Sequence, residues 1–528
     1  MIDRRTLVVG AALAGIAGPV IAATSGPRTI RLETATILDL DAAMAAGALT
    51  AERLVGLHLA RIRRYDPVTR AIITLNPAAL DIARALDAER RAHGARSPMH
   101  GVPVVLKDNI DTVDMATTGG SFVLAGSRPG ADAAVVQRLR DAGAIILAKT
   151  NLSEFAAGPP FSSVHGQTYN PYNHAYTAGG SSSGSGAAIA AGYATLALGT
   201  DTGGSVRGPS TINGIVGLKP TAGLLSMAGI MPLSLTFDTA GPMARSVADV
   251  AVALGIMAGP GGERDYSRFL DAGALAGARL GLVRTFTGND ADYDRAIEQA
   301  AVSIRAAGGT VIDVRFPDWM MAVKGEFYTT VRWPEFRPQI DAYLARLGPG
   351  YPHDLAELAR RSNALVVPNA SGFVRNDARW ALFATEMASG PVDDPVTRNI
   401  RERGLPLIRH ALEAMLDRDR LDGFIYLTTS IRPPLVEEPA ANDTAAAFGS
   451  TSWATQFASL AGLPDLVVPC GFTHDGLPIG LSIMGRAFSE PRLLALGHAF
   501  ERRVMARRPP PAMPPLAGET ISFRVGRA

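Results

Sequence analysis

Apolar segments typical of buried strands alternate with helical segments, and this alternation restricts the fold of the chain more than any other feature. Residues 102–107 form an apolar run, residues 132–141 have a helical pattern that ends at Gly143, and residues 144–148 form a second apolar run. Strands that are joined through a helix pair in parallel, because the helix returns the chain to its starting edge. The pattern resumes at residues 278–284, 293–307 and 310–314, and again at 424–427, 466–468 and 479–484. The sequence therefore predicts an α/β fold: a single large domain with a mostly parallel mixed central sheet, covered by helices on both faces.

The remaining segments are assigned around this core. Residues 24–95 are expected to form a helical lead-in, and residues 96–316 and 405–528 the two parts of the core, the second with a Pro-rich tail. Residues 317–404 interrupt the alternation and are rich in Trp and Tyr. We interpret them as a helical insertion or cap near the substrate pocket, with ordinary packing of the aromatic side chains on the sheet as the alternative.

Residues 1–23 have the composition of a signal peptide. Arg4 and Arg5 precede an apolar run over residues 11–21, and two alanines follow it. The run is too short to span a bilayer comfortably, and the paired arginines resemble a twin-arginine signal, which exports folded proteins. We therefore expect a periplasmic or secreted protein with no stable membrane insertion after cleavage.

Composition excludes several classes of function. The chain has 51 basic and 49 acidic residues, a net charge of +2, and this balance gives no basic stripe, so we expect no nucleic-acid partner. Cys470 is the only cysteine, so no intrachain disulfide can form, and its apolar surroundings predict a packed, unreactive thiol. The nine histidines show no metal-site spacing such as HExxH, so we expect no metal and no cofactor.

Two glycine-rich loops carry the strongest chemical signal. The first covers residues 179–186 (GGSSSGSG) and the second residues 199–207 (GTDTGGSVR). Glycine allows backbone N–H groups to approach a ligand closely. The N–H groups of Thr202, Gly203, Gly204 and Ser205 are expected to surround one point, as an oxyanion hole for a tetrahedral intermediate requires.

A serine hydroxyl in these loops would need a base to become a nucleophile. The histidines offer no convincing partner. A lysine can serve if burial lowers its pKa enough to leave the amine neutral. Lys107 ends an apolar run, so partial burial of its side chain is expected.

Several longer motifs give the chain a close resemblance to the amidase signature family over roughly residues 40–505. They are GVPVVLKDN (101–109), KTNLSEF (149–155), the two glycine-rich loops, GLKP (217–220), DTAGPMARSVAD (238–249) and GLPIGL (476–481). The resemblance implies that Lys107 is the catalytic lysine, that Ser181 is a bridging serine after a cis peptide bond, and that Ser205 is the acylated nucleophile. In the implied mechanism neutral Lys107 takes a proton from Ser181, Ser181 takes one from Ser205, and Ser205 attacks the carbonyl.

Neighbouring residues are given supporting roles. Ser182 is expected to assist the relay by hydrogen bonding, and Asp201 to hold the second loop. Arg207 is expected to be structural, with binding of a substrate carboxylate as the alternative. Lys149 and Lys219 are also interpreted as structural.

The substrate class is less sharply indicated than the chemistry. Residues 108–120, 166–172, 212–217 and 489–491 are similar to those of bacterial peptide amidases, so we expect a small-molecule or peptide amide substrate and a monomer or homodimer. Carbamate, aryl-amide or ester hydrolysis by the same triad is the alternative. Two remote alternatives remain. One is the glutaminase subunit of a tRNA-dependent amidotransferase, against which export argues strongly. The other is a phosphate-binding protein that is not a hydrolase, for which no Walker or kinase motif is present.

Overall fold

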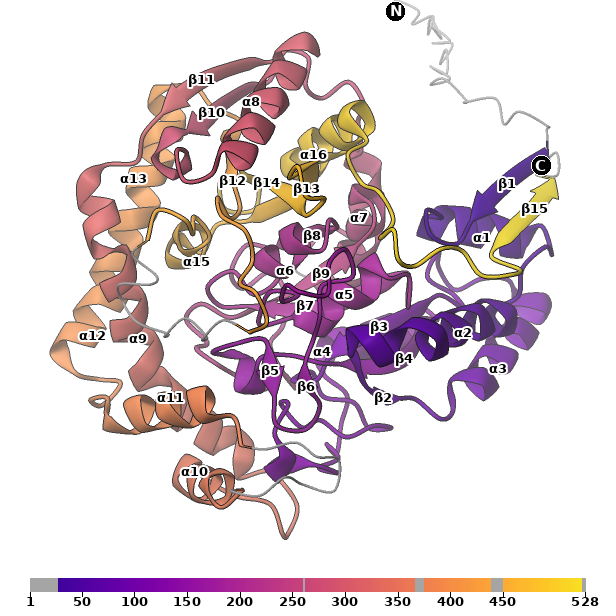
Figure 1. Ribbon diagram of the computed structural model, residues 1–528, viewed down its shortest axis with the longest axis horizontal. Coiled ribbons are helices and arrows are strands. Elements are labelled where there is room, and N and C mark those ends of the chain that lie inside the picture. The colour runs from indigo at the N-terminus through magenta and orange to yellow at the C-terminus, as the bar shows by residue number, and fades with distance from the viewer. Residues whose placement is uncertain (1–26, 260–261, 366–374, 438–449, 525–528) are drawn as a thin grey trace, which may run out of the picture.

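The computed structural model describes residues 27–259, 262–365, 375–437 and 450–524. Within them eleven strands form one central sheet in the order β11-β10-β12-β14-β13-β8-β9-β7-β3-β4-β2 (Figure 1). The strands are β2 (Ile72–Leu75), β3 (Pro103–Lys107), β4 (Ile145–Thr150), β7 (Leu196–Asp201), β8 (Val216–Lys219), β9 (Thr239–Ala244), β10 (Arg279–Val283), β11 (Thr310–Val314), β12 (Gly423–Leu427), β13 (Asp465–Phe472) and β14 (Pro478–Met484). The α/β class and the mixed central sheet are thereby confirmed.

The strand directions differ in one respect from the expectation. Among the described strands β3 is parallel to β4 and β7, and β10 is parallel to β11 and β12, whereas the other six neighbouring pairs are antiparallel. The expected predominance of parallel pairs is therefore wrong. Its physical reason is that β8, β9, β13 and β14 fill the middle of the sheet as antiparallel neighbours, and antiparallel pairs need no helical crossover.

Helices cover both faces of the sheet. Val104 and Leu106 of β3 belong to a core cluster that includes Val135 of α4 (Ala134–Asp141). Val105 belongs to a second cluster that includes Ile189 of α5 (Ser183–Ala190). This division follows from the alternation of side chains along a strand. The helices outside the aromatic segment are α1 (Ile37–Ala45), α2 (Ala51–Thr69), α3 (Ala79–His93), α4 (Ala134–Asp141), α5 (Ser183–Ala190), α6 (Arg207–Ile212), α7 (Val247–Ala258), α8 (Ala291–Ala306), α13 (Leu405–Arg418), α15 (Gln456–Ala461) and α16 (Glu490–Val504).

The aromatic segment after β11 is helical in its described part. It contains α9 (Asp318–Leu344), α10 (Leu355–Asn363), α11 (Asp377–Ala388), α12 (Pro395–Asn399) and a π-helical turn at Ile400–Gly404. Figure 1 shows these helices together at one side of the molecule, far from β1. Residues 24–95, expected to form a helical lead-in, contain α1, α2 and α3 and also supply β1 (Pro27–Arg31) and β2, the last strand of the central sheet.

The two ends of the described chain lie side by side. β1 (Pro27–Arg31) pairs with β15 (Thr520–Arg524) in antiparallel register (Figure 1). A further two-stranded sheet pairs β5 (Phe161–Ser162) with β6 (Gly166–Gln167). The signal peptide expected at 1–23 lies outside the described residues, and no helix within them has the length and apolar character needed to cross a bilayer.

Candidate active site

The sheet brings Lys107 and the second glycine-rich loop to the same edge. β3 ends at Lys107 and its parallel neighbour β7 ends at Asp201. Parallel strands have their carboxyl ends at one edge, where α/β proteins commonly bind ligands. Lys107 shares the sheet face of Val105, which α5 covers, and the loop before α5 carries Ser181. The sequence motifs thus converge although they are far apart in the chain.

Lys107 is fully buried and is held by two hydroxyl groups. Its Nζ donates to Oγ of Ser181 at 2.6 Å and to Oγ1 of Thr200 at 2.7 Å. Burial lowers the pKa of Lys107 to about 7, although the charges of Asp201 and Asp238 act in the opposite direction. Near neutral pH a large fraction of this amine is therefore unprotonated and able to accept a proton.

Sequence reasoning did not single out two further residues that position the side chain of Lys107. Thr200 binds Lys107, and Nδ2 of Asn109 donates to Oγ1 of Thr200 at 3.2 Å and to the carbonyl oxygen of Met231 at 3.4 Å. Both residues stand inside the quoted motifs, Asn109 two positions after Lys107 and Thr200 directly before Asp201. Their place in these motifs was therefore the available signal, but their side chains alone suggest no role in proton transfer.

Asp201 organises the loop that carries Ser205. Its carboxylate accepts hydrogen bonds from the N–H of Gly204 at 2.9 Å and of Val206 at 3.0 Å, and from the guanidinium of Arg207. Burial alone would raise the pKa of Asp201, but the adjacent Arg207 outweighs it and holds the pKa at about 2. A permanently ionised carboxylate therefore fixes the turn on both sides of Ser205.

Arg207 is buried and makes contacts with protein groups. Beyond Asp201, it donates to Asp465, to Oγ of Ser459 and to the carbonyl oxygen of Thr455. Its guanidinium joins the nucleophile loop to β13 and α15. This geometry agrees with the structural role expected of Arg207 and not with the carboxylate-binding alternative. Lys149 is likewise internal, with Nζ 3.0 Å from Asp108.

The expected oxyanion cradle needs one correction. The Gly204 N–H donates to Asp201, so it is not directed at a substrate. The N–H groups of Gly203 and Ser205 donate to no acceptor within the described ranges, and Thr202 precedes them in the same loop. Gly204 has a φ of +130°, and a Cβ there would lie 2.5 Å from Oγ1 of Thr455. Glycine is therefore required for the shape of the loop, even though its N–H does not line the cradle.

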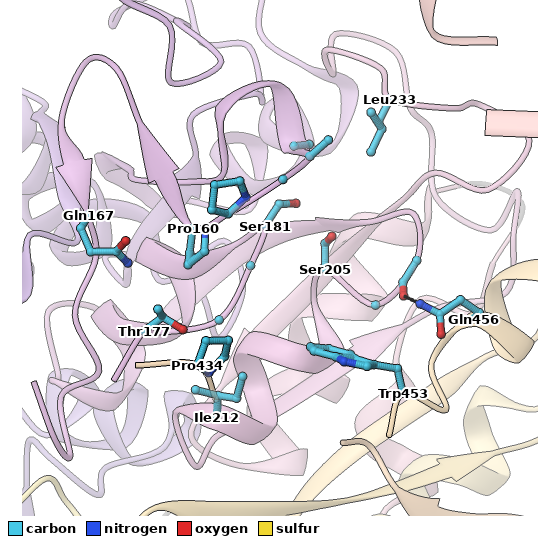
Figure 2. A pocket seen from close by; sticks show the side chains of 18 of the residues that line it. Pro160, Gln167, Thr177, Ser181, Ser205, Ile212, Leu233, Pro434, Trp453 and Gln456 are labelled. Atoms are coloured by element: carbon cyan, nitrogen blue, oxygen red, sulfur yellow. Dashed lines mark hydrogen bonds between the residues drawn. The ribbon is translucent and has the colours of Figure 1, made fainter. Parts of the chain in front are cut away.

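Ser181 and Ser205 face the same space. The peptide bond between Gly180 and Ser181 is cis, as the family resemblance implies, and Figure 2 shows both hydroxyls directed into the cavity. Both residues are described, yet no hydrogen bond joins their Oγ atoms. Serine hydroxyls move by rotation about χ1, and catalytic contacts commonly tighten only when substrate is bound.

Ser182 forms its hydrogen bonds with Thr200, the residue that also binds Lys107. Its Oγ donates to the carbonyl oxygen of Thr200 at 3.3 Å and accepts from the Thr200 N–H at 3.4 Å. Ser182 directly precedes α5, and its hydroxyl satisfies backbone groups at the end of β7. Ser182 thus positions Thr200, which contacts Lys107. Its assistance to proton transfer stays a prediction.

The two serines lie at a cavity of about 240 Å³. Its wall is largely apolar and includes Pro159, Pro160, Ile212, Leu233, Pro434 and Trp453 (Figure 2). Tyr328 and Arg332 of α9 also line it, so part of the aromatic segment reaches the site. Among the described lining residues Arg332 is the one with a charged side chain. It is buried, and its guanidinium lies 3.2 Å from the carboxylate of Glu386.

One group of side chains within the described ranges has the spacing of metal ligands. It consists of Asp292, His474 and Asp475. It shares no residue with the cavity wall, and the carboxylate of Asp292 already accepts from Arg432 and Arg295. The two arginines neutralise the carboxylate that a cation would need, so this group fits an ion-pair network better than a metal site.

Comparison with known proteins identifies several relatives. A family model described as Amidase matches residues 53–494. The glutamyl-tRNA(Gln) amidotransferase subunit from Chloroflexus aggregans is 36% identical over 483 residues, which cover 88% of this chain and 96% of that protein.

Solved structures extend this comparison. The peptide amidase of Stenotrophomonas maltophilia superimposes with a TM-score of 0.81 at 39% identity, covering 90% of this chain and 98% of its own. The corresponding glutamyl-tRNA(Gln) amidotransferase subunit from Thermotoga maritima gives a TM-score of 0.68 at 25% identity, covering 91% of this chain and 98% of its own.

Proposed function

This chain belongs to the amidase signature family, and from that premise we propose that it hydrolyses the terminal amide of peptides through an acyl-enzyme on Ser205. The observation that carries the proposal is the contact between Lys107 and Ser181 at the wall of the cavity that Ser205 also lines. A buried amine whose pKa is near 7 can act as a base without any other titrating group.

The proposed reaction uses the proton relay of Lys107, Ser181 and Ser205 twice, once to form the acyl-enzyme and once to hydrolyse it. Lys107 removes the proton of Ser181 while Ser181 removes that of Ser205, whose oxygen attacks the amide carbon. The negative charge on the carbonyl oxygen is stabilised by backbone N–H groups of the Gly203 loop. The relay then reverses and protonates the leaving nitrogen. Water attacks the acyl-enzyme by the same route and releases the acid.

The cavity supports a neutral amide substrate of peptide size. Its apolar wall suits the side chain of the residue that carries the amide, and burial of such a side chain contributes about 1.5–3 kcal/mol. The likeness to the peptide amidase at 39% identity points the same way. Aryl amides, carbamates and esters could react by the same relay and are the alternatives that a substrate panel separates.

Covalent labelling tests the proposed roles. A fluorophosphonate should label Ser205, detected by mass spectrometry of the peptide that contains it. Ser205→Ala should abolish the label. Ser181→Ala should slow labelling by about 10²-fold or more, as expected for loss of general-base assistance, without moving the label. Label on Ser181, or robust amide turnover by Ser205→Ala, would reverse the assignment.

A second candidate function is that of a glutaminase subunit, favoured by the 36% identity with the Chloroflexus protein. Free glutamine carries an α-ammonium group, and burial of such a charge requires an anionic partner. No carboxylate lines the cavity among the described residues. Ammonia release should therefore be much faster from a blocked dipeptide amide than from L-glutamine. Preference for glutamine would favour the second candidate.

We also propose that the protein is exported through its N-terminal residues. The basis is the arrangement of Arg4 and Arg5 before the apolar run, which the family membership does not address. A folded mature enzyme starting near Ala23 should be recovered outside the cytoplasm.

A further inference from the structure

Gln456 is a buried polar residue of the cavity that the proposed reaction does not use. It begins α15, is 2% exposed and lines the cavity. Its Nε2 donates to the carbonyl oxygen of Gly203 at 3.2 Å. A carbonyl oxygen can only accept, so the NH2 group of Gln456 must face Gly203. This contact fixes which end of the side-chain amide is the oxygen.

The Oε1 atom of Gln456 has no hydrogen-bond partner within the described part of the chain. A buried amide oxygen left without a donor is costly, and most such groups in folded proteins are paired. Gln456 lines the same cavity as Ser205, and its Oε1 atom is buried. Thr177 also has an unpaired Oγ1 in this wall, but a rotating hydroxyl can donate or accept and therefore specifies no partner. Gln456 requires an N–H or O–H donor.

The position of Gln456 indicates which part of a substrate supplies this donor. Figure 2 shows Ser181 and Gln456 on opposite sides of Ser205. In the proposed relay Ser181 protonates the leaving nitrogen, so the leaving group lies on the Ser181 side. The acyl part of the substrate then extends away from Ser181, and its nearest polar hydrogen is the backbone N–H of the residue that carries the amide.

We infer that Gln456 is a specificity-determining residue whose Oε1 accepts a hydrogen bond from the backbone N–H of the residue bearing the scissile amide. The inference rests on the proposed function and narrows the substrate class to N-acylated amino-acid amides. Simple carboxylic amides and aryl amides lack this N–H and leave Oε1 unpaired. A site built around such an acceptor discriminates against analogues that lack the donor.

A pair of isosteric substrates tests the inference. One is a blocked dipeptide amide, and the other is its depsipeptide analogue, in which an ester oxygen replaces the N–H of the terminal residue. Ammonia release gives kcat/KM for both. The unmodified enzyme should prefer the peptide by about tenfold to a hundredfold, the usual effect of one buried hydrogen bond. Gln456→Met removes the acceptor at similar volume and should reduce the preference to within about threefold.

Thr455→Val is the matched control. Oγ1 of Thr455 donates to the same Gly203 carbonyl oxygen at 2.7 Å, so this variant disturbs the nucleophile loop but leaves Oε1 of Gln456 in place. It should lower kcat/KM for both substrates by the same factor and keep the preference. Loss of the preference in Thr455→Val would attribute it to loop geometry and overturn the inference.

The outcomes separate this inference from the proposed function. Equal rates on both substrates by the unmodified enzyme, a result that requires no variant, would overturn the role of Gln456 while leaving amide hydrolysis intact. An unchanged preference in Gln456→Met would do the same. Failure of the unmodified enzyme to release ammonia from either substrate would overturn the proposed function and the inference with it.

Discussion

The buried amine of Lys107 should cost the protein stability in a way that depends on pH. Its pKa is about 7 in the folded protein, against 10.5 for an ordinary lysine. Between these two values the unfolded chain carries a proton that the folded protein lacks. Stability therefore rises with pH across this window, and the full cost is present below about pH 7. Lys107→Met removes the titrating group at similar length, so the variant should lack this contribution.

The magnitude follows from the two pKa values. Each pKa unit corresponds to about 1.4 kcal/mol, so the whole difference of 10.5 − 7 = about 3.5 units is worth roughly 5 kcal/mol. Only part of this free-energy difference develops within the pH range that is convenient for measurement. Between about pH 6 and pH 9 the free energy of unfolding of the unmodified protein should rise by roughly 3 kcal/mol relative to that of Lys107→Met.

Urea denaturation of both proteins at several pH values measures this difference. Other titrating groups act on both proteins alike, so subtraction removes them. The m-values should agree, which verifies that the same surface is exposed in the two transitions.

A difference that stays flat from pH 6 to pH 9 would mean that Lys107 keeps its proton in the folded protein throughout this range. A difference of opposite sign would mean that the folded state stabilises the charged form. Either result would refute the neutral base and, with it, the proton relay that begins at Lys107.

The remaining predictions concern activity, structure and export. The kcat/KM for amides should rise with pH and level off above about pH 7, and Lys107→Arg should lower it by at least about 10²-fold, because guanidinium stays protonated; an active arginine variant would contradict this. Arg207→Met should cost about 3–5 kcal/mol of stability, measured by denaturation, because it leaves the buried carboxylates of Asp201 and Asp465 unpaired; an unchanged transition would show that the network carries little energy. Activity should survive exhaustive EDTA treatment, and loss restored by zinc would contradict a metal-free mechanism. Replacement of Arg4 and Arg5 by lysine should block the appearance of a mature extracytoplasmic form on immunoblots; export that continues unchanged would argue against a twin-arginine signal.

Local sequence patterns predicted the apolar strands well but not the centre of the sheet. β3, β4 and β12 contain runs of apolar residues, and β10 and β11 are rich in Leu, Val and Ile. β7 (LALGTD) and β9 (TAGPMA) are buried along their whole length, although alanine, glycine and threonine make up more than half of their residues. Such strands show no run of four or more large apolar residues and no regular alternation, so the local pattern distinguishes them poorly from loops.

The site residues likewise differ in whether a local sequence pattern reveals them. Lys107, Ser181 and Ser205 stand in recognisable motifs, and the sheet brings two of them into contact. Gln456 contacts Gly203 across 253 positions of the chain, a contact that depends on the order of strands and cannot be found from local pattern. The direction of the Gly204 N–H was also beyond prediction, because it depends on the rotation of a single peptide plane.

The pairing of β1 with β15 makes the beginning and end of the fold into a β-hairpin that lacks its turn. Pro27 and Arg524 are opposite one another in the ladder, so a linker of about two to five residues would join them. The chain could then be opened at an exposed turn, such as that at Gly476 between β13 and β14, to give a circular permutant. In ribosomal synthesis the natural order has the opposite effect: β1 is made long before β15, so the β1–β15 pair can form only after β15 has been synthesised.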